Sequence, residues 1–217
     1  MGVGEADTER LIKEKAKILF FQKGFLNATT QEIADEAGIN RALIHYYFRS
    51  RDQLLETLLD ETMKQKKERV ITILTSELPF RQKIALYIDA VVDYGLMYPF
   101  LDNFIISSTS RRPDKIREFC ARDKQRSANL IRKELEEEIQ EGRLAPITAE
   151  HFMVNISAMC NYPLLAKPVI QAIHCMSDPA YKKFLLERKQ IIYMTVFNEP
   201  MPKLPSKKEL MKLTHKN

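Results

Sequence analysis

The stretch AKILFFQKGFLNATTQEIADEAGINRALIHYYFRSRDQLLETLL, residues 16–59, contains several helix-boundary signals close together. Thr29 opens a T-x-x-E capping box, which predicts the start of a helix. Gly38 is suited to end that helix, because glycine adopts a positive φ readily. Asn40 is then an N-cap for a helix expected over 41–47. Two short helices joined by a turn that contains a glycine form a helix-turn-helix layout.

Apolar side chains around this layout predict how its helices pack. An amphipathic first helix is expected over 7–23, ended by Gly24, and its apolar face consists of Ile12, Ala16, Leu19 and Phe20. The residues expected to pack against that face are Ile33, Ile39, Ile44 and Phe48. The residues that the third helix then leaves free to enter a DNA major groove are Arg41, Ala42, His45 and Tyr46. An ordinary helical hairpin without a DNA role has the same layout.

The rest of the chain predicts further helices between breakers. Ser50 begins a second capping-box match, which opens a long helix to about Ser76. Further helices are expected at about 80–95, 100–109, 113–141, 147–162 and 179–198. No β alternation is sustained, so the predicted fold class is all-α. Residues after Asn198 indicate a linker and a basic tail, with a marginal short helix from Ser206.

The net charge of +5, from 34 Lys and Arg against 29 Asp and Glu, is weak support for nucleic-acid binding because of where it lies. Residues 203–217 contain five Lys and one Glu, which accounts for +4 of the total. The segment from Arg41 to Arg51 is more informative, since it has three Arg, one His and no acidic residue. The basic tail is either a disordered end or an arm that adds non-specific attraction to DNA.

Other function classes find little support in the residues. The four His are scattered, and the chain has neither a nucleophile motif nor a Gly-rich phosphate loop, so we expect no enzyme, cofactor or metal site. Cys120, Cys160 and Cys175 are expected to be buried thiols in a reducing cytoplasm. The polar, acidic N-terminus does not predict a signal peptide, and no stretch approaches 18 uncharged apolar residues, so no membrane partner is expected.

Residues 16–59 resemble the N-terminal domain of the TetR family of bacterial transcriptional regulators. The family pattern is F-x-x-x-G-F/Y, then T-x-x-x-I-A-x-x-A-G, then Y-x-Y/H-F-x-S-K-x-x-L. The matching residues, without a gap, are Phe20, Gly24, Phe25, Thr29, Ile33, Ala34, Ala37, Gly38, Tyr47, Phe48, Ser50 and Leu54. The resemblance implies a sequence-specific DNA-binding regulator, typically a repressor, with a three-helix head joined to a larger helical-bundle body.

The resemblance also implies a division of the chain. A DNA-binding domain is expected over 1–50, a ligand-binding and dimerisation domain over 51–198, and a basic, flexible tail over 199–217. A small-molecule effector is expected to favour a body conformation in which the two heads are wrongly spaced for the operator. The alternative is a helical interaction or ligand-binding module with lost or altered DNA binding, an alternative that His45 suggests.

The residues expected to contact DNA are Thr29, Thr30, Asn40, Arg41, Ala42, His45, Tyr46 and Arg51. Thr29, Thr30 and Arg51 are expected to hold phosphates, and Arg41 to read a guanine through O6 and N7. Tyr46 is expected at a phosphate or a thymine methyl. His45 stands where the family usually has a Tyr, and Arg51 where it usually has a Lys. Arg51 keeps the charge, whereas His45 either binds a phosphate or only fills the space.

In the body, the dimer interface is expected at about 147–166 and 179–198. The segment from Ile191 to Phe197 is apolar on nearly every side, although burial within one subunit would also explain this pattern. The residues expected to line an effector pocket are Met63, Tyr87, Tyr94, Phe100, Phe104, Phe119 and Met153. Plain core packing is the alternative for each, but tyrosine hydroxyls inside an apolar bundle need partners, which a ligand would supply.

Overall fold

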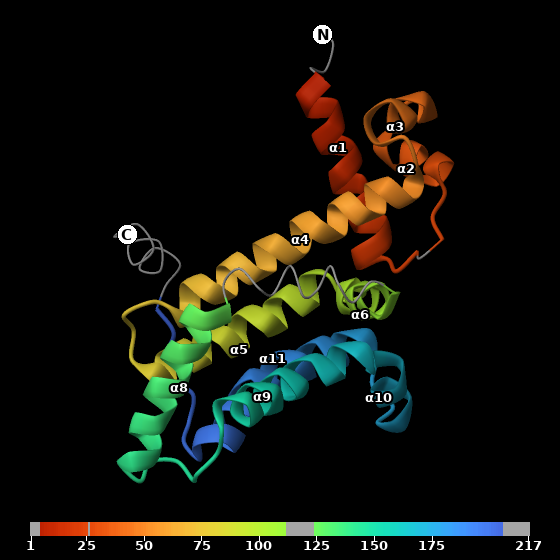
Figure 1. Ribbon diagram of the computed structural model, residues 1–217. Helices are drawn as coiled ribbons and strands as arrows, with labels where there is room; N and C mark the ends of the chain where they lie inside the picture. Colours follow the sequence, from red (N-terminus) through yellow and green to blue (C-terminus); the bar gives the residue numbers. More distant parts are fainter. Residues whose placement is uncertain (1–4, 26, 112–123, 206–217) are drawn as a thin grey trace.

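The computed structural model describes residues 5–25, 27–111 and 124–205, and every regular element in these ranges is a helix, as predicted (Figure 1). The head consists of α1 (Glu5–Lys17), η1 (Ile18–Gln22), α2 (Thr30–Ala37) and α3 (Arg41–Phe48). The body consists of α4 (Arg51–Leu74), α5 (Phe80–Met97), α6 (Leu101–Arg111), α8 (Lys124–Gln140), α9 (Ala149–Leu165), α10 (Lys167–Ile173) and α11 (Asp178–Phe197). The short helix expected from Ser206 lies outside the described residues.

The first helix differs in its last turn from the regular helix expected over 7–23. α1 continues directly into η1, a single π-helical turn, and Gly24 at φ +74° follows it. Phe20 and Phe21 in η1 are buried, and their rings lie 6.1 Å and 5.5 Å from the ring of Phe104 in α6. π-turns are rare insertions in α-helices, and the apolar spacing predicted this helix without the π-turn.

The apolar cluster predicted around the helix-turn-helix is confirmed. Its buried members include Leu19, Phe20, Ile33, Ile44 and Phe48, and Ile39 packs against them. The same cluster takes in Leu54 and Leu58 of α4 and Leu101 of α6, so the core of the head extends beyond residue 50. The domain division at that residue stays a prediction.

α4 connects the head to the rest of the molecule. In Figure 1 the head lies at one end of α4, which runs from there across the body. Its 24 residues contain neither Gly nor Pro, so no kink is expected in it. Leu58 of α4 lies in the core of the head and Leu74, at its last turn, lies in the core of the body. One uninterrupted helix therefore belongs to both cores.

α5 occupies the centre of the body, where it packs against α4, α9 and α11. It crosses α9 closely at Gly95, where an added Cβ would lie 2.0 Å from Cδ1 of Leu164. Side chains elsewhere on α5, including Ile84, Ile88 and Val91, are buried in the same core. The glycine thus allows the two helices to approach to ordinary van der Waals contact.

Two prolines that were expected to separate helices lie within them instead. Pro163 is inside the last turn of α9, which continues to Leu165. Pro168 is in the first turn of α10, a helix that the sequence did not predict. A first-turn proline is tolerated because the N–H that it lacks would have no helical partner. No residue of α10 is buried, so an apolar face could not indicate this helix.

The cysteines differ in exposure. Cys160 is buried, as expected, whereas the same expectation is wrong for Cys175, which is exposed. Cys120 lies outside the described residues. Within the described ranges, no single helix is long and apolar enough to cross a membrane, and only the bent pair Phe80–Met97 and Leu101–Ser107, at 95°, has that length and composition.

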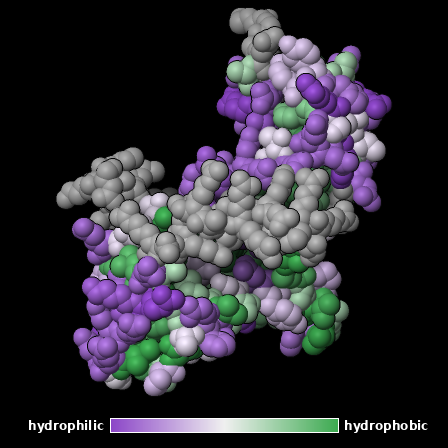
Figure 2. All heavy atoms as spheres, in the orientation of Figure 1, coloured by the Kyte–Doolittle hydropathy of each residue, from purple (hydrophilic) through white to green (hydrophobic). Residues whose placement is uncertain are grey.

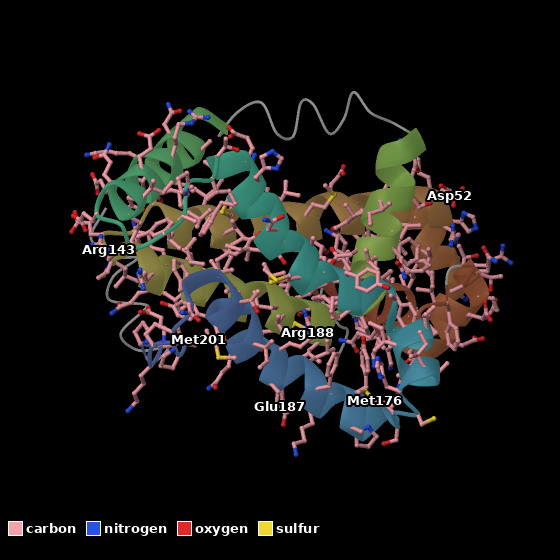
Figure 3. All side chains as sticks on the ribbon, turned by 90° about the horizontal axis from the view of Figure 1, so that it is seen from below. Asp52, Arg143, Met176, Glu187, Arg188 and Met201 are labelled. Carbon is pink, nitrogen blue, oxygen red and sulfur yellow. The ribbon has the colours of Figure 1, made fainter. Side chains whose placement is uncertain are left out.

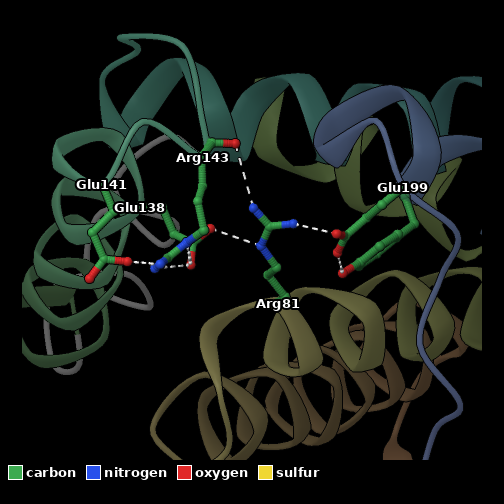
Figure 4. Close-up of polar contacts among 6 residues, drawn as sticks. Arg81, Glu138, Glu141, Arg143 and Glu199 are labelled. Carbon is green, nitrogen blue, oxygen red and sulfur yellow. Dashed lines mark hydrogen bonds and ion pairs between the residues drawn. The ribbon is translucent and has the colours of Figure 1, made fainter.

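A network of charges joins α5, α8 and the segment that follows α11 (Figure 4). Arg81 donates through Nε to Glu138 at 2.8 Å, and its Nη1 lies 2.7 Å from a carboxylate oxygen of Glu199. Arg143 binds the other oxygen of Glu138 at 2.8 Å. In Figure 3, Arg143 lies on the opposite side of the molecule from Asp52, which is in the first turn of α4 next to the head. The charge network is therefore at the end of the body away from the head. The network therefore holds the segment after α11, which the composition predicted to be a linker, against the body.

Candidate nucleic-acid interface

The start of α2 is fixed by the capping box that the sequence predicted. Thr29 Oγ1 accepts the backbone N–H of Glu32 at 3.2 Å, and the Glu32 carboxylate accepts the N–H of Thr29 at 2.7 Å. The hydrogen bonds from the backbone and hydroxyl of Thr29 lower the pKa of Glu32. Thr29 is exposed at the helix N-terminus, whereas the neighbouring side chain of Thr30 is buried. A helix N-terminus favours an anion, and here the Glu32 carboxylate accepts from both the N–H and the hydroxyl of Thr29.

A tight turn sets the direction of α3. Gly38 adopts φ +65°, and the N–H of Ile39 donates to the carbonyl of Ala34 at 3.0 Å, which closes the end of α2. The side chain of Asn40 accepts the N–H of Ala42 at 2.8 Å and thereby caps α3. The role of Asn40 visible in the structure is thus to shape the start of α3.

One side of α3 is buried in the core of the head and the other is open. Ile44 and Phe48 are buried. The residues on the open side are Arg41, Ala42, His45 and Tyr46, all of them exposed and Tyr46 to 69%. This is the face that the sequence predicted to be free. No hydrogen bond or ion pair engages the Arg41 guanidinium within the described part of the chain.

His45 is tied to the C-terminal end of its own helix. Its Nδ1 lies 2.8 Å from the carbonyl oxygen of Arg49, so the tautomer that fits carries the proton on Nδ1 and donates it to that oxygen. Arg49 has a positive φ of 61°, and the imidazole satisfies the carbonyl at this sharp end of α3. Nε2 is then the nitrogen that remains available on the exposed face.

The side chain of Arg51 contacts partners that are distant from it in the sequence as well as its neighbour Asp52. Its Nε donates to the carbonyl oxygen of Ala28 at 3.1 Å, and its Nη1 lies 2.7 Å from Asp52 Oδ1. Its guanidinium carbon lies 5.2 Å from the centroid of the Phe20 ring. Ala28 and Phe20 are distant in the sequence from Arg51, so no local pattern predicted these partners.

The residues predicted to line an effector pocket are divided between the two cores. Tyr87 is buried in the core of the body, and Met153 packs against it. Phe104 is buried in the core of the head, and Tyr94 packs against it. The ring of Phe100 lies over Gly24, and Met63 is half-buried on α4. Phe119 lies outside the described residues.

Comparison of the sequence with known proteins identifies the family of the DNA-binding head. Residues 12–58 match the model of the family described as bacterial regulatory proteins, tetR family. The probable HTH-type transcriptional regulator YttP of Bacillus subtilis is 25% identical over 202 residues, covering 89% of this chain and 95% of that protein. Residues 12–58 are a TetR-family DNA-binding domain. With this domain and these relatives, the chain is a DNA-binding transcriptional regulator.

Solved structures show that the TetR-family fold extends beyond the head to most of the chain. AibR, solved in complex with isovaleryl coenzyme A and operator DNA, is similar with a TM-score of 0.64 and 15% identity over 88% of this chain and 98% of that one. The ketosteroid transcriptional regulator KstR2 of Mycobacterium tuberculosis gives 0.63 and 15%, over 88% and 95%. The body of this TetR-family protein therefore keeps the fold at low sequence identity.

Proposed function

We propose that this TetR-family protein acts in the cytoplasm as a homodimeric repressor, which leaves its operator when a small molecule binds to the body. The observation that carries the proposal is the open side of α3. It presents Arg41, His45 and Tyr46 without a neighbouring carboxylate, while the opposite side of the helix is fixed in a core of buried apolar residues. A rigid helix with an exposed, acid-free face matches the requirements of major-groove recognition.

Each exposed group has a role in this proposal. α3 lies in the major groove, where the fork of Arg41 reads O6 and N7 of a guanine. Ala42 and Tyr46 flank Arg41 on the same face, where Tyr46 reaches a thymine methyl or a phosphate. Thr29, with the backbone amides of the first turn of α2, holds a phosphate, and His45 in its doubly protonated form donates through Nε2 to another. Asn40 keeps the start of α3 in place by capping it.

Exposed apolar side chains on the last two long helices support the dimer. Val154 and Tyr162 on α9 are 63% and 61% exposed, and Ile191 and Met194 on α11 are 46% and 48% exposed. Between these two helices lies a groove of about 530 Å³, lined in part by Phe152 and other apolar residues. Figure 2 shows apolar patches on the body, whereas the visible surface of the head is mainly hydrophilic. A second copy of the chain would cover this apolar surface.

Polar groups without a partner inside the body support an effector site. Thr62 Oγ1 on α4 and Asn161 Oδ1 on α9 are buried and have no hydrogen-bond partner within the described residues. Buried polar atoms in proteins nearly always have one. On the helix between them, Tyr94 donates to the carbonyl of Thr62 at 3.3 Å, and the hydroxyl of Tyr87 lies 2.9 Å from that of Ser157. A small molecule held among α4, α5 and α9 would satisfy the unpaired oxygens.

The proposal is tested by titrating labelled genomic DNA fragments with the full-length protein at two salt concentrations. We expect one or a few fragments to bind much more tightly than the rest, with a steep fall in affinity as salt increases. Sedimentation of the same samples should give a dimer both free and on DNA. Equal and weak binding to all fragments would contradict the proposal and favour a helical interaction module that has lost DNA binding.

A further inference from the structure

We propose that Arg51 is a positioning residue of the DNA-binding head, which fixes the start of α2 against α4. The inference rests on the proposed DNA binding and concerns how the head is held in its binding geometry. It follows from three contacts of a single guanidinium group, made with the loop before α2, with η1 and with the neighbouring Asp52 of α4.

The side chain of Arg51 lies against the head. Arg51 is the first residue of α4, a position at which a cation would ordinarily extend into solvent. Its side chain is only 25% exposed. The Nε–H is used by the Ala28 carbonyl, the Nη1 by Asp52, and the face of the guanidinium lies over the ring of Phe20 in η1. Two of the five N–H donors of the guanidinium are therefore used within the protein, and one of its faces is covered by an aromatic ring.

The carbonyl that Arg51 binds, that of Ala28, lies next to the start of α2. Ala28 is buried and directly precedes Thr29, the N-cap of α2. The loop that leads to it is tight, because the N–H of Ala28 donates to the carbonyl of Phe25 at 3.1 Å and that of Phe25 to the carbonyl of Leu19 at 2.9 Å. The hydrogen bond from Arg51 connects this loop to α4. The Arg51 bond therefore sets the position of the α2 N-terminus relative to the long helix.

Arginine and lysine differ in the contacts that they can make at position 51. A lysine keeps the positive charge but lacks both the Nε donor and the flat surface that stacks on an aromatic ring. For a direct phosphate contact, a point charge at the start of α4 would suffice. For a positioning role, the planar group is required. Arg51→Lys therefore separates the two roles at constant charge.

The experiment compares operator binding by the wild-type protein and by Arg51→Lys at several salt concentrations, at a temperature where unfolding curves show both to be fully folded. We expect Arg51→Lys to bind about tenfold more weakly, because the fork and the stacking are lost, with the same slope of log affinity against log salt as the wild type. Arg132→Lys is the matched control, since Arg132 also bonds neighbouring side chains but lies on α8 of the body. It should bind as the wild type does.

A second variant tests the route of the effect. Phe20 is 0% exposed and cannot touch DNA, so Phe20→Leu changes the surface under the guanidinium without removing a DNA contact. We expect Phe20→Leu to weaken operator binding while the protein stays folded, and the double variant with Arg51→Lys to be little worse than Arg51→Lys alone. Full additivity of the two changes would overturn the proposed route through Phe20.

The inference is overturned if Arg51→Lys binds as tightly as the wild type, because a point charge at the start of α4 would then suffice. Failure of the inference is distinct from failure of the proposed function. The wild-type titration reports the latter, because a protein without sequence-dependent, salt-sensitive binding would be no regulator of this kind, whatever the behaviour of its variants.

Discussion

The guanidinium of Arg188 in α11 donates through Nη2 to the carbonyl oxygen of Met159 in α9 at 3.3 Å. That carbonyl has no helical partner, because the residue four positions later is Pro163, which lacks an N–H. Figure 3 shows Arg188 on the inner side of α11, with the preceding Glu187 turned away from the body. A side chain of α11 thus completes the hydrogen bonding of α9 at the proline, where the sequence predicted that the helix would end.

This relationship predicts an energetic coupling between Arg188 and Pro163. Arg188→Met should lower the free energy of unfolding by about 1–1.5 kcal/mol, because a half-buried carbonyl loses its donor. In a Pro163→Ala background the restored N–H serves that carbonyl, so the same change should cost at least about 0.5 kcal/mol less. Urea unfolding of the wild type, both single variants and the double variant measures the coupling. Equal costs in both backgrounds would contradict it.

Gly95 predicts a steric limit at the crossing of α5 and α9. Gly95→Ala would place a methyl group 2.0 Å from Leu164 Cδ1, and the two helices would have to separate or repack. We expect a loss of about 1–3 kcal/mol in the free energy of unfolding. The matched test is Gly95→Ala together with Leu164→Ala, which removes the clashing group. Thermal unfolding should show this double variant to be more stable than the sum of the single losses; simple additivity would mean that the contact is relieved in another way.

Arg41 predicts sequence-specific readout by α3. Arg41→Ala should weaken operator binding by about 1–3 kcal/mol and relax the preference at one base pair. Binding to an operator and to a set of its single-base-pair variants, measured by fluorescence anisotropy, checks both effects. Arg132→Ala on the body is the control. Uniform weakening across all sequences would instead make Arg41 a phosphate contact.

The charge network around Arg81 predicts a dependence of stability on pH. Burial raises the pKa of Glu138, but hydrogen bonds from Arg143 and Arg81 outweigh it and the net shift is downward; the hydrogen bond from Arg81 likewise lowers the pKa of Glu199. A carboxyl whose pKa is lower in the folded protein than in the unfolded chain stabilises the fold above its unfolded pKa, near 4.3. This stabilisation is lost as the pH falls through the lower, folded pKa.

Arg81→Met should therefore lower the melting temperature at pH 7, and the difference from the wild type should shrink as the pH falls below about 4. Scanning calorimetry from pH 7 to pH 3 measures it. Arg10→Met removes an exposed ion pair on α1 and should have little effect at either pH. A difference for Arg81→Met that is independent of pH would assign its effect to the loss of packing on Phe197, which the guanidinium covers at 5.0 Å.

The two described cysteines predict different reactivity. Burial raises the pKa of Cys160 to about 12, so its thiolate is scarce at neutral pH, whereas Cys175 is exposed. In a Cys120→Ser variant, a maleimide should label Cys175 rapidly in the native protein and Cys160 only after unfolding. Mass spectrometry of the peptides checks this order, and rapid native labelling of Cys160 would contradict the buried position.

Local signals in the sequence were sufficient for the head. The caps at Thr29, Asn40 and Ser50, and the glycine at position 38, specify helix ends through contacts a few residues apart, and the structure has each of them. The same local logic explains why Arg41, Ala42, His45 and Tyr46 could be assigned to one exposed face. Their exposure follows from helical period alone once Ile44 and Phe48 are recognised as core.

Contacts between distant residues could not be predicted in this way. The continuation of α9 past Pro163 depends on Arg188 in another helix, and the π-turn at Phe20 and Phe21 lies against α6. Arg51 was predicted to hold a phosphate from its charge and position, whereas its partners come from the loop before α2 and from η1. Tertiary partners decide these features, and a single sequence does not contain the pairing.

The uninterrupted course of α4 has a mechanical consequence. A helix of 24 residues is about 36 Å long, and without Gly or Pro it resists bending between its ends. Leu74 anchors one end among body side chains, and Leu58 carries the head near the other. A rotation of about 5° about the anchored end would move the far end by about 3 Å, close to the rise of one base pair. α4 would thus act as a lever arm: a rotation of this size in the body would displace the head by about the length of one base-pair step.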